Sequence, residues 1–229
     1  MQHLLELMIA NCRNLNEIIS RYYDSFDELA SSAEKAAVLK KYTCGGLVLP
    51  RGYFCPSPVL DLVVGGGNRG RIVKDPNRYD SKEITTYWFD KDQHLCLIER
   101  PWKDRELIIR EGSVELGILK DTHGLLLEVS RCVYDSGRLV LYERGLCNSE
   151  SLKVSFLEKE TYCYGEKGLT FSTWFRYSEK NQIEKTVFQF DHSPEGYLSK
   201  YRITEHQTMN RSDNPWEGQE FTITQHRRV

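Results

Sequence analysis

The feature that most constrains this fold is a series of tight-turn sequences at nearly regular intervals in the second part of the chain. Runs rich in Val, Ile, Thr, Tyr, Phe and Trp lie between the turns from Val59 onward, and such runs favour strands. Turn starts at 165, 178 and 193 are 13 and 15 residues apart. One strand of ~8–10 residues plus one tight turn needs about that length. Each strand is therefore expected to pair with the next strand along the chain.

This spacing predicts an antiparallel meander of roughly eight to eleven strands between Val59 and His206. No stretch inside the meander is long enough for the crossover helix that parallel strands require. Ser193-Pro-Glu-Gly196 is the clearest turn, because its serine can bond the backbone, its proline presets φ and its glycine adopts the left-handed conformation. We expect the resulting sheet to be strongly twisted or to curve into a half-barrel.

The N-terminal part of the chain has a different pattern, which predicts a helical hairpin. Apolar residues recur every three or four positions from Leu4 to Tyr22, as on one face of an amphipathic helix. Good helix formers predict a second helix between Asp27 and Tyr42, which the glycines that follow would end. The break between the two helices is expected near Asp24.

The chain therefore divides into three parts. These are a helical hairpin at residues 1–45, an irregular crossing rich in Gly and Pro at 46–58, and an antiparallel β-meander domain at 59–229. An aromatic content of 11% together with the Leu, Ile and Val runs excludes a fully disordered chain. Together these patterns predict an α+β protein.

Charge and cysteine content indicate where the protein acts. With 31 basic and 33 acidic residues, the net charge of −2 argues against binding to nucleic acid or to an anionic membrane surface. No apolar run approaches the ~18 residues of a membrane-spanning helix, and the first residues lack the pattern of a signal peptide. The 7 cysteines form no CxxC pair, so we expect reduced thiols in a cytoplasmic protein.

One phrase recurs within the meander. Its clearest copy is YDSGRLVLY at 134–142, and looser copies begin at Tyr87 and Phe190. This aromatic-Asp-x-x-Gly-x-Leu phrase resembles YD/RHS-type β-hairpin repeats and the meanders of immunity proteins of bacterial polymorphic toxin systems. The resemblance implies a bacterial protein that neutralises a toxin by binding it. Ordinary hairpin chemistry is the alternative, because aromatic residues flank turns and Gly closes them in many β proteins.

Residues 65–70, Gly-Gly-Gly-Asn-Arg-Gly, formally match the G-x-G-x-x-G pattern of phosphate-binding loops. In a nucleotide-binding unit a helix follows the glycines, and its N-terminus stabilises the phosphate. Here a short β-like stretch follows and Pro76 ends it, so we expect a hairpin connection. An anion-binding nest that uses Arg69 and Arg71 is the alternative.

The sequence predicts no cofactor and no metal site. Its cysteines lie at least 11 residues apart, whereas zinc sites normally take two ligands from one turn. Buried thiols and solvated turn histidines account for these residue types. A catalytic cysteine or an acid–base pair would have to be assembled by the fold, so a small hydrolase or nuclease-like enzyme is the alternative class of function.

The strand around Trp174 carries aromatic residues on both faces. Trp174 alternates with Ser172 and Arg176, while the aromatic residues at 171, 175 and 177 occupy the opposite face. A sheet that buries one face leaves the other polar, so we expect either a closed or strongly twisted sheet or a recognition surface. Tyr142 and Arg144 form a similar pair. These two pairs are the candidate anchors for another protein, and the sequence favours a non-enzymatic binding function.

Overall fold

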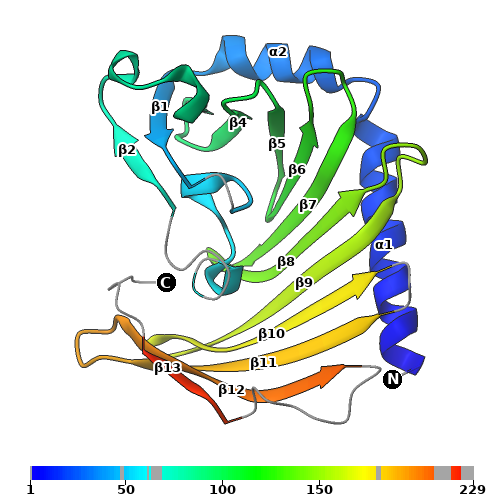
Figure 1. The fold of residues 1–229 in the computed structure, drawn as a ribbon, viewed down its shortest axis with the longest axis vertical. Coiled ribbons are helices and arrows are strands. Elements are labelled where there is room, and N and C mark those ends of the chain that lie inside the picture. The colour runs from blue at the N-terminus through cyan, green and yellow to red at the C-terminus, as the bar shows by residue number, and fades with distance from the viewer. Residues whose placement is uncertain are drawn as a thin grey trace.

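A computed structural model describes residues 2–46, 49–60, 62, 69–178, 182–208 and 218–222. In this part of the chain, two N-terminal helices precede a sheet of 13 strands that pair antiparallel. The α+β fold class is therefore confirmed. The sheet curves strongly, so that it has an outer face along which the helices lie and an inner face toward residues 49–60 (Figure 1).

The strands are short at the edges of the sheet and long in its middle. In chain order they are β1 (Leu39–Cys44), β2 (Arg71–Val73), β3 (Ile84–Phe89), β4 (Leu95–Glu99), β5 (Arg105–Glu111), β6 (Val114–Lys120), β7 (Leu126–Asp135), β8 (Arg138–Cys147), β9 (Val154–Gly165), β10 (Gly168–Ser178), β11 (Ile183–His192), β12 (Leu198–Thr208) and β13 (Glu220–Thr222). Three described 3-10 turns are η1 (Gly52–Phe54), η3 (Pro76–Arg78) and η4 (Ser81–Glu83).

The order of the strands confirms the antiparallel meander. Every strand from β3 to β12 pairs with the next strand along the chain, and β13 extends the sheet beyond β12. These ten strands fall within the predicted range of eight to eleven. The other edge departs from sequence order, because β1 pairs with both β3 and β2 and so lies between them.

Helices α1 (Gln2–Tyr22) and α2 (Phe26–Ala36) cover the outer face, with the break between them near Asp24 as predicted. The apolar positions of α1 pack on outer-face residues such as Leu126 and Leu157. Its buried apolar side chains are Met8, Cys12, Leu15 and Ile19. Within the described residues, neither helix has the length and apolar character needed to cross a membrane.

The second helix is shorter than the sequence predicts. It ends at Ala36, and residues 39–42, which were expected to belong to it, lie in β1 instead. The register of β1 on β3 runs from Leu39 opposite Phe89 to Cys44 opposite Ile84. The prediction was wrong because a full strand partner outweighs the weak helix preference of the lysines in this stretch. Residues 39–44 therefore belong to the sheet and not to the helical hairpin.

The inner face is covered by the crossing segment, defined here as residues 49–60 together with 62 (Figure 1). We predicted β structure from Val59 onward, but residues 58–60 are helical. The cause is Ser57, whose Oγ accepts a hydrogen bond from the backbone N–H of Leu60 at 2.9 Å. Serine in this capping position, followed by proline, favours the start of a helical turn. Val59 and Leu60 are then buried against the inner face of the sheet.

Candidate functional site

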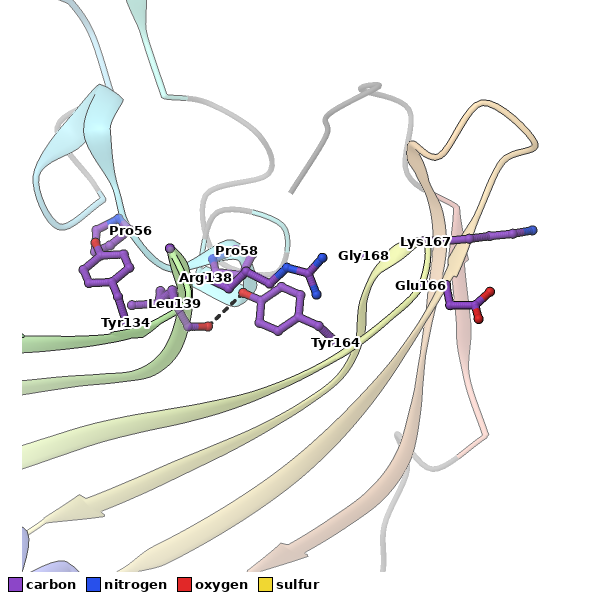
Figure 2. Close-up of a pocket in the computed structure, with 10 residues that line it drawn as sticks. Pro56, Pro58, Tyr134, Arg138, Leu139, Tyr164, Glu166, Lys167 and Gly168 are labelled. Carbon is purple, nitrogen blue, oxygen red and sulfur yellow. Dashed lines mark hydrogen bonds between the residues drawn. The ribbon is translucent and has the colours of Figure 1, made fainter. Parts of the chain in front are cut away.

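A cleft of about 440 Å³ lies where the β7–β8 and β9–β10 hairpins turn (Figure 2). One wall of the cleft is formed by Pro56 and Pro58 of the crossing segment. The two hairpins provide the floor, and Glu166 and Lys167 lie at the tip of the second hairpin. The cleft therefore joins segments that are far apart in the sequence.

Tyr134, Tyr164 and Arg138 form the floor. The Tyr164 hydroxyl donates a hydrogen bond of 2.8 Å to the backbone carbonyl of Leu139, which links β9 to β8 and fixes the ring (Figure 2). The Arg138 guanidinium lies 5.4 Å from the centre of the Tyr164 ring, in a cation–π contact. Burial raises the pKa of both tyrosine hydroxyls, so both remain protonated at neutral pH. The floor is thus a fixed aromatic surface with an exposed cation beside it.

The β7–β8 turn places these side chains. Its two connecting residues, Ser136 and Gly137, have φ angles of 49° and 78°. Positive φ at both central positions is the property of the two-residue turn whose twist matches that of paired strands. The phrase at 134–142 therefore forms the hairpin that the sequence predicts. One consequence is that Arg138 follows the turn directly and points into the cleft (Figure 2).

A buried hydrogen-bond cluster joins the proline wall to the sheet. The Ser57 Oγ lies 2.7 Å from each carboxylate oxygen of Glu160, and the Tyr162 hydroxyl donates to the same carboxylate at 2.6 Å. Burial raises the pKa of Glu160 to about 7. Ser57 and Glu160 are both 0% exposed. Because neither group reaches solvent, the cluster is a structural joint and not a nucleophile with its base.

Arg51 is a second buried anchor of the crossing segment. Its guanidinium donates to Glu106 and to the Ser130 Oγ, each at 3.1 Å, and also to Glu115. Arg51 and Glu106 are 2% and 1% exposed. Gly117 leaves the room for this contact, since a Cβ there would lie 2.9 Å from the Arg51 Nη2. These carboxylates are therefore paired and hold the segment in place.

Two of the predicted anchors, Tyr142 and Trp174, lie on the inner face on either side of Glu160. They are 0% and 8% exposed and belong to the inner apolar cluster. Of the two alternatives that the sequence left open for this strand, a recognition surface would need these two rings to be exposed, whereas in the structure the curved sheet and its inner cover bury both. On the opposite face of β10, Phe175 and Tyr177 pack in the outer cluster. The closed or strongly twisted alternative therefore describes this strand.

The other two predicted anchors, Arg144 and Arg176, form the next row across the same strands. Arg144 donates to Glu128 at 2.8 Å and to Glu158 at 3.2 Å, so its positive charge is paired with two carboxylates of the protein itself. Arg176 lies 4.8 Å from the centre of the Trp174 ring, and its side chain is 40% exposed. None of the four anchors is among the residues that line the cleft.

The glycines at 65–67 fall outside the described residues, so the glycine-loop prediction is not tested. Arg69 and Arg71 are described, and they have different partners. Arg69 donates from Nη1 to the carbonyl of Tyr53 at 3.3 Å. The Arg71 guanidinium lies 5.4 Å from the centre of the Tyr79 ring. Both arginines are therefore engaged by the protein itself.

One group of described residues has the ligand types and the closeness that a metal ion needs. Ligand atoms of Asp90, Asp92 and His94, in the β3–β4 turn, lie within 4.8 Å of one another. The Asp90 Oδ1 already accepts hydrogen bonds from the backbone N–H groups of the other two residues, which accounts for the turn by itself.

Two cysteines were candidates for reactive thiols. Burial raises the pKa of the Cys132 thiol to about 11 and that of the Cys147 thiol to about 12, which makes both weak nucleophiles at neutral pH.

Comparison with known proteins does not assign the cleft. No family model matches the sequence, and no curated protein matches it.

Sequence reasoning did not identify the cleft residues as a site. Pro56 and Pro58 indicated only an irregular segment, and Tyr134 and Arg138 indicated only a hairpin. One usable signal was present, because Ser57 followed by Pro58 is typical of a helix start. That signal would have located the proline wall as an ordered element. Nothing local could have shown that this wall meets the two hairpin turns.

Proposed function

We propose that the protein is a non-catalytic binding protein whose cleft holds a segment of a partner protein. The observation that supports this most directly is the fixed aromatic and cationic floor of Tyr134, Tyr164 and Arg138. Tyrosine and arginine are the residue types that most often dominate binding energy at protein interfaces. Because the Tyr164 ring is already held by its hydrogen bond to the Leu139 carbonyl, binding would cost little side-chain entropy.

The lining also indicates the chemistry of the bound segment. Pro56, Pro58 and Leu139 provide apolar contact area next to the tyrosine rings. Arg138 is exposed, and its guanidinium is not among the ion pairs found in the described residues. A segment that places an apolar side chain against the tyrosines and a carboxylate on Arg138 would fit this combination. Charge-assisted hydrogen bonds from arginine to carboxylate are the strong ones.

The hairpin resemblance suggests a toxin as the partner. Neutralisation would then follow from occupancy alone, since a bound toxin segment is unavailable for its own contacts. Arg176, the most exposed of the anchors predicted from sequence, stays a candidate for a second contact outside the cleft. A hydrolase or nuclease-like function stays an alternative, but none of the described contacts favours it.

The test is site-directed photo-crosslinking in the source cells, followed by reconstitution. A photoreactive amino acid at Lys167, beside the cleft, should capture one protein that the same group at Lys91, in the β3–β4 turn, does not capture. The purified captured protein should bind the intact chain directly. Arg138→Ala should weaken that binding by at least ~30-fold, the equivalent of ~2 kcal/mol for an interface hot spot.

Arg202→Ala is the matched control, because Arg202 is also an exposed arginine but lies on β12, away from the cleft. It should leave affinity within about twofold. Equal capture from both positions, or equal effects of the two arginine variants, would contradict a protein-binding cleft. A small molecule that co-purifies with the chain and is lost in Arg138→Ala would assign the cleft to a different class of ligand. For a toxin partner, co-expression of the intact chain should restore growth and co-expression of Arg138→Ala should not.

A further inference from the structure

We propose that Glu160 is a positioning residue for the cleft, and that it acts through Ser57 to hold the wall formed by Pro56 and Pro58. This inference rests on the proposed function only in taking the cleft as the binding site. The joint itself is a property of the free protein and can be tested without a partner.

The geometry places the joint directly behind the wall. Ser57 lies between the two wall prolines, and its Oγ is 2.7 Å from both oxygens of Glu160 on β9. Proline fixes its own φ and restricts the residue before it. A displacement of Ser57 is therefore transmitted to both neighbouring rings and is not absorbed by backbone rotation. The wall can keep its place only while Ser57 keeps its contact with the carboxylate.

Ser57 also holds the next turn of the crossing segment. The same Oγ accepts the backbone N–H of Leu60 at 2.9 Å while its hydroxyl hydrogen points to Glu160. Val59 and Leu60 are buried at 0% and 3% exposure against the inner face. One hydroxyl thus links the proline wall, the helical turn and the sheet.

The hydrogen bonds of the joint are complete when Glu160 is ionised. Ser57 and Tyr162 each donate one hydrogen to the carboxylate, and the carboxylate has no hydrogen of its own to place. A protonated Glu160 would bring an additional hydrogen into the cluster, whereas the ionised form leaves a charge away from water. The two states of Glu160 therefore differ in how firmly the segment is held.

The hydrogen bonds from Ser57 and Tyr162 lower the pKa of Glu160, whereas its burial raises it. Burial is the larger effect, and the resulting pKa is about 7. The polar groups that act on Glu160 are Ser57 of the crossing segment, Glu158 and Tyr162 on β9, and Arg144 on β8, and Tyr142 lies opposite it on β8. Three more titratable or charged groups lie against these neighbours: Arg176 on β10 opposite Glu158, Cys132 on β7 opposite Tyr142, and Cys55 of the crossing segment near Tyr142. In the unfolded or opened segment the pKa returns toward ~4.3. Glu160 binds its proton more tightly when the crossing segment is attached to the sheet. Attachment of the segment is therefore most favoured at low pH. Its advantage is lost as pH rises through about 7.

The experiment compares four variants of the full chain by hydrogen exchange and by NMR of ¹³C-labelled tyrosine rings. Ser57→Ala removes the link, Ser57→Thr keeps a hydroxyl, and Glu160→Gln keeps the shape of the carboxylate but does not ionise. Ser172→Ala is the matched control, because Ser172 is a serine 1% exposed on the same sheet face whose Oγ has no hydrogen-bond partner in the described structure.

Exchange is read at the Cys55 amide, which bonds to the Gly52 carbonyl and so reports on the segment without contacting Ser57 Oγ. Ser57→Ala should accelerate it at least ~10-fold and should shift or broaden the ring signals of Tyr134 and Tyr164. The Tyr201 ring, stacked on Phe221 at 4.8 Å, should not move. Ser57→Thr and Ser172→Ala should match the wild type in both measurements.

The pH profile separates positioning from a purely structural role. Exchange at Cys55, corrected for its intrinsic rate, should increase in the wild type as pH rises from 6 to 8, and Glu160→Gln should show no such increase. The proposal is overturned if the Tyr134 and Tyr164 signals are unchanged in Ser57→Ala, or if Glu160→Gln keeps the wild-type profile. Both outcomes concern the free protein, so they are distinct from a failure of the crosslinking test, which would remove the binding function and leave the joint intact.

Discussion

The two faces of the sheet are covered in different ways, and the difference shows what each cover requires. The outer cover consists of two regular helices, whose backbone groups bond within the helix and whose apolar stripes need only a matching apolar surface. The inner cover is an irregular segment, whose attachment depends on buried polar contacts from Arg51 and Ser57. A helix can be placed by apolar packing alone, whereas an irregular segment needs specific partners.

This contrast predicts different sensitivities to substitution. Loss of an apolar contact on the outer face removes packing, and the remaining helix still covers the sheet. Loss of one polar partner on the inner face leaves buried charged groups with fewer partners, which is more costly than the original contact was worth. The inner cover should therefore respond more strongly to single changes. It also forms a wall of the candidate binding cleft, so its disruption would reach the function directly.

The largest effect is expected for Arg51→Ala. The change removes the fully buried cation that Glu106 and Glu115 share and leaves them only the more exposed Arg100 and Arg110, and breaking a buried ion pair costs ~3–5 kcal/mol of the free energy of unfolding. Urea unfolding measures it. Arg21→Ala is the control, because Arg21 pairs with Glu111 on the outer side but is 61% exposed, and it should cost less than ~1 kcal/mol. Similar losses for the two variants would remove the distinction between the two covers.

A smaller loss, of about 3 kcal/mol, is expected for Leu15→Ala in α1. Leu15 is fully buried in the outer cluster, so the change leaves a cavity but no unpaired charge. Leu7→Ala on the same helix should change the unfolding free energy by no more than ~0.5 kcal/mol, since Leu7 is 40% exposed. If Leu15→Ala were more costly than Arg51→Ala, apolar packing and not polar anchoring would dominate the stability of the fold.

The same contrast explains which parts of the fold could be predicted from the sequence. The meander and α1 follow from local patterns, namely turn residues at regular spacing and an apolar repeat of three to four residues. The end of α2 could not be predicted, because the Lys-rich stretch near Tyr42 suits either structure and β3 decides between them. The burial of Trp174 depends on the curvature of the whole sheet, which no local pattern records.

The position of the cleft could not be predicted from the sequence for a related reason. Its floor is visible in sequence as a hairpin phrase, but its wall is placed by contacts over long sequence separations, from Ser57 to Glu160 and from Arg51 to Glu106. In sequence, a buried glutamate has the same appearance as the solvated ones around it. The position of an irregular segment is therefore hard to predict from sequence when contacts with distant residues hold it in place.

Gly117→Ala tests how closely Arg51 fits the inner face, with an expected loss of ~1–3 kcal/mol for overpacking. A Cβ at this position would collide with the Ser130 Oγ and would lie 2.8 Å from the Glu106 carboxylate and 2.9 Å from the Arg51 Nη2. Because part of the clash is with the anchored guanidinium, the loss should shrink when Gly117→Ala is combined with Arg51→Ala. Additive losses in urea unfolding would show that the methyl group disturbs the backbone and not the anchor.

The smallest effect on stability is expected for Tyr164→Phe. The change removes the hydrogen bond from the tyrosine hydroxyl to the Leu139 carbonyl but keeps the ring, so the free energy of unfolding should fall by only ~1 kcal/mol. Tyr22→Phe, which removes the hydroxyl bonded to Glu111 on the exposed outer side, provides the comparison and should cost less. The two variants should differ more in the mobility of the ring than in stability, because Tyr164 lines the cleft and is fixed at both ends by β9 and by its hydroxyl.

NMR should show faster flipping of the aromatic ring at position 164 in Tyr164→Phe than in the wild type, with a melting temperature close to that of the wild type. That result would show that this hydrogen bond keeps the Tyr164 ring ordered in the cleft floor. Unchanged ring dynamics would show that packing against Arg138 and the inner apolar cluster is sufficient to fix the Tyr164 ring.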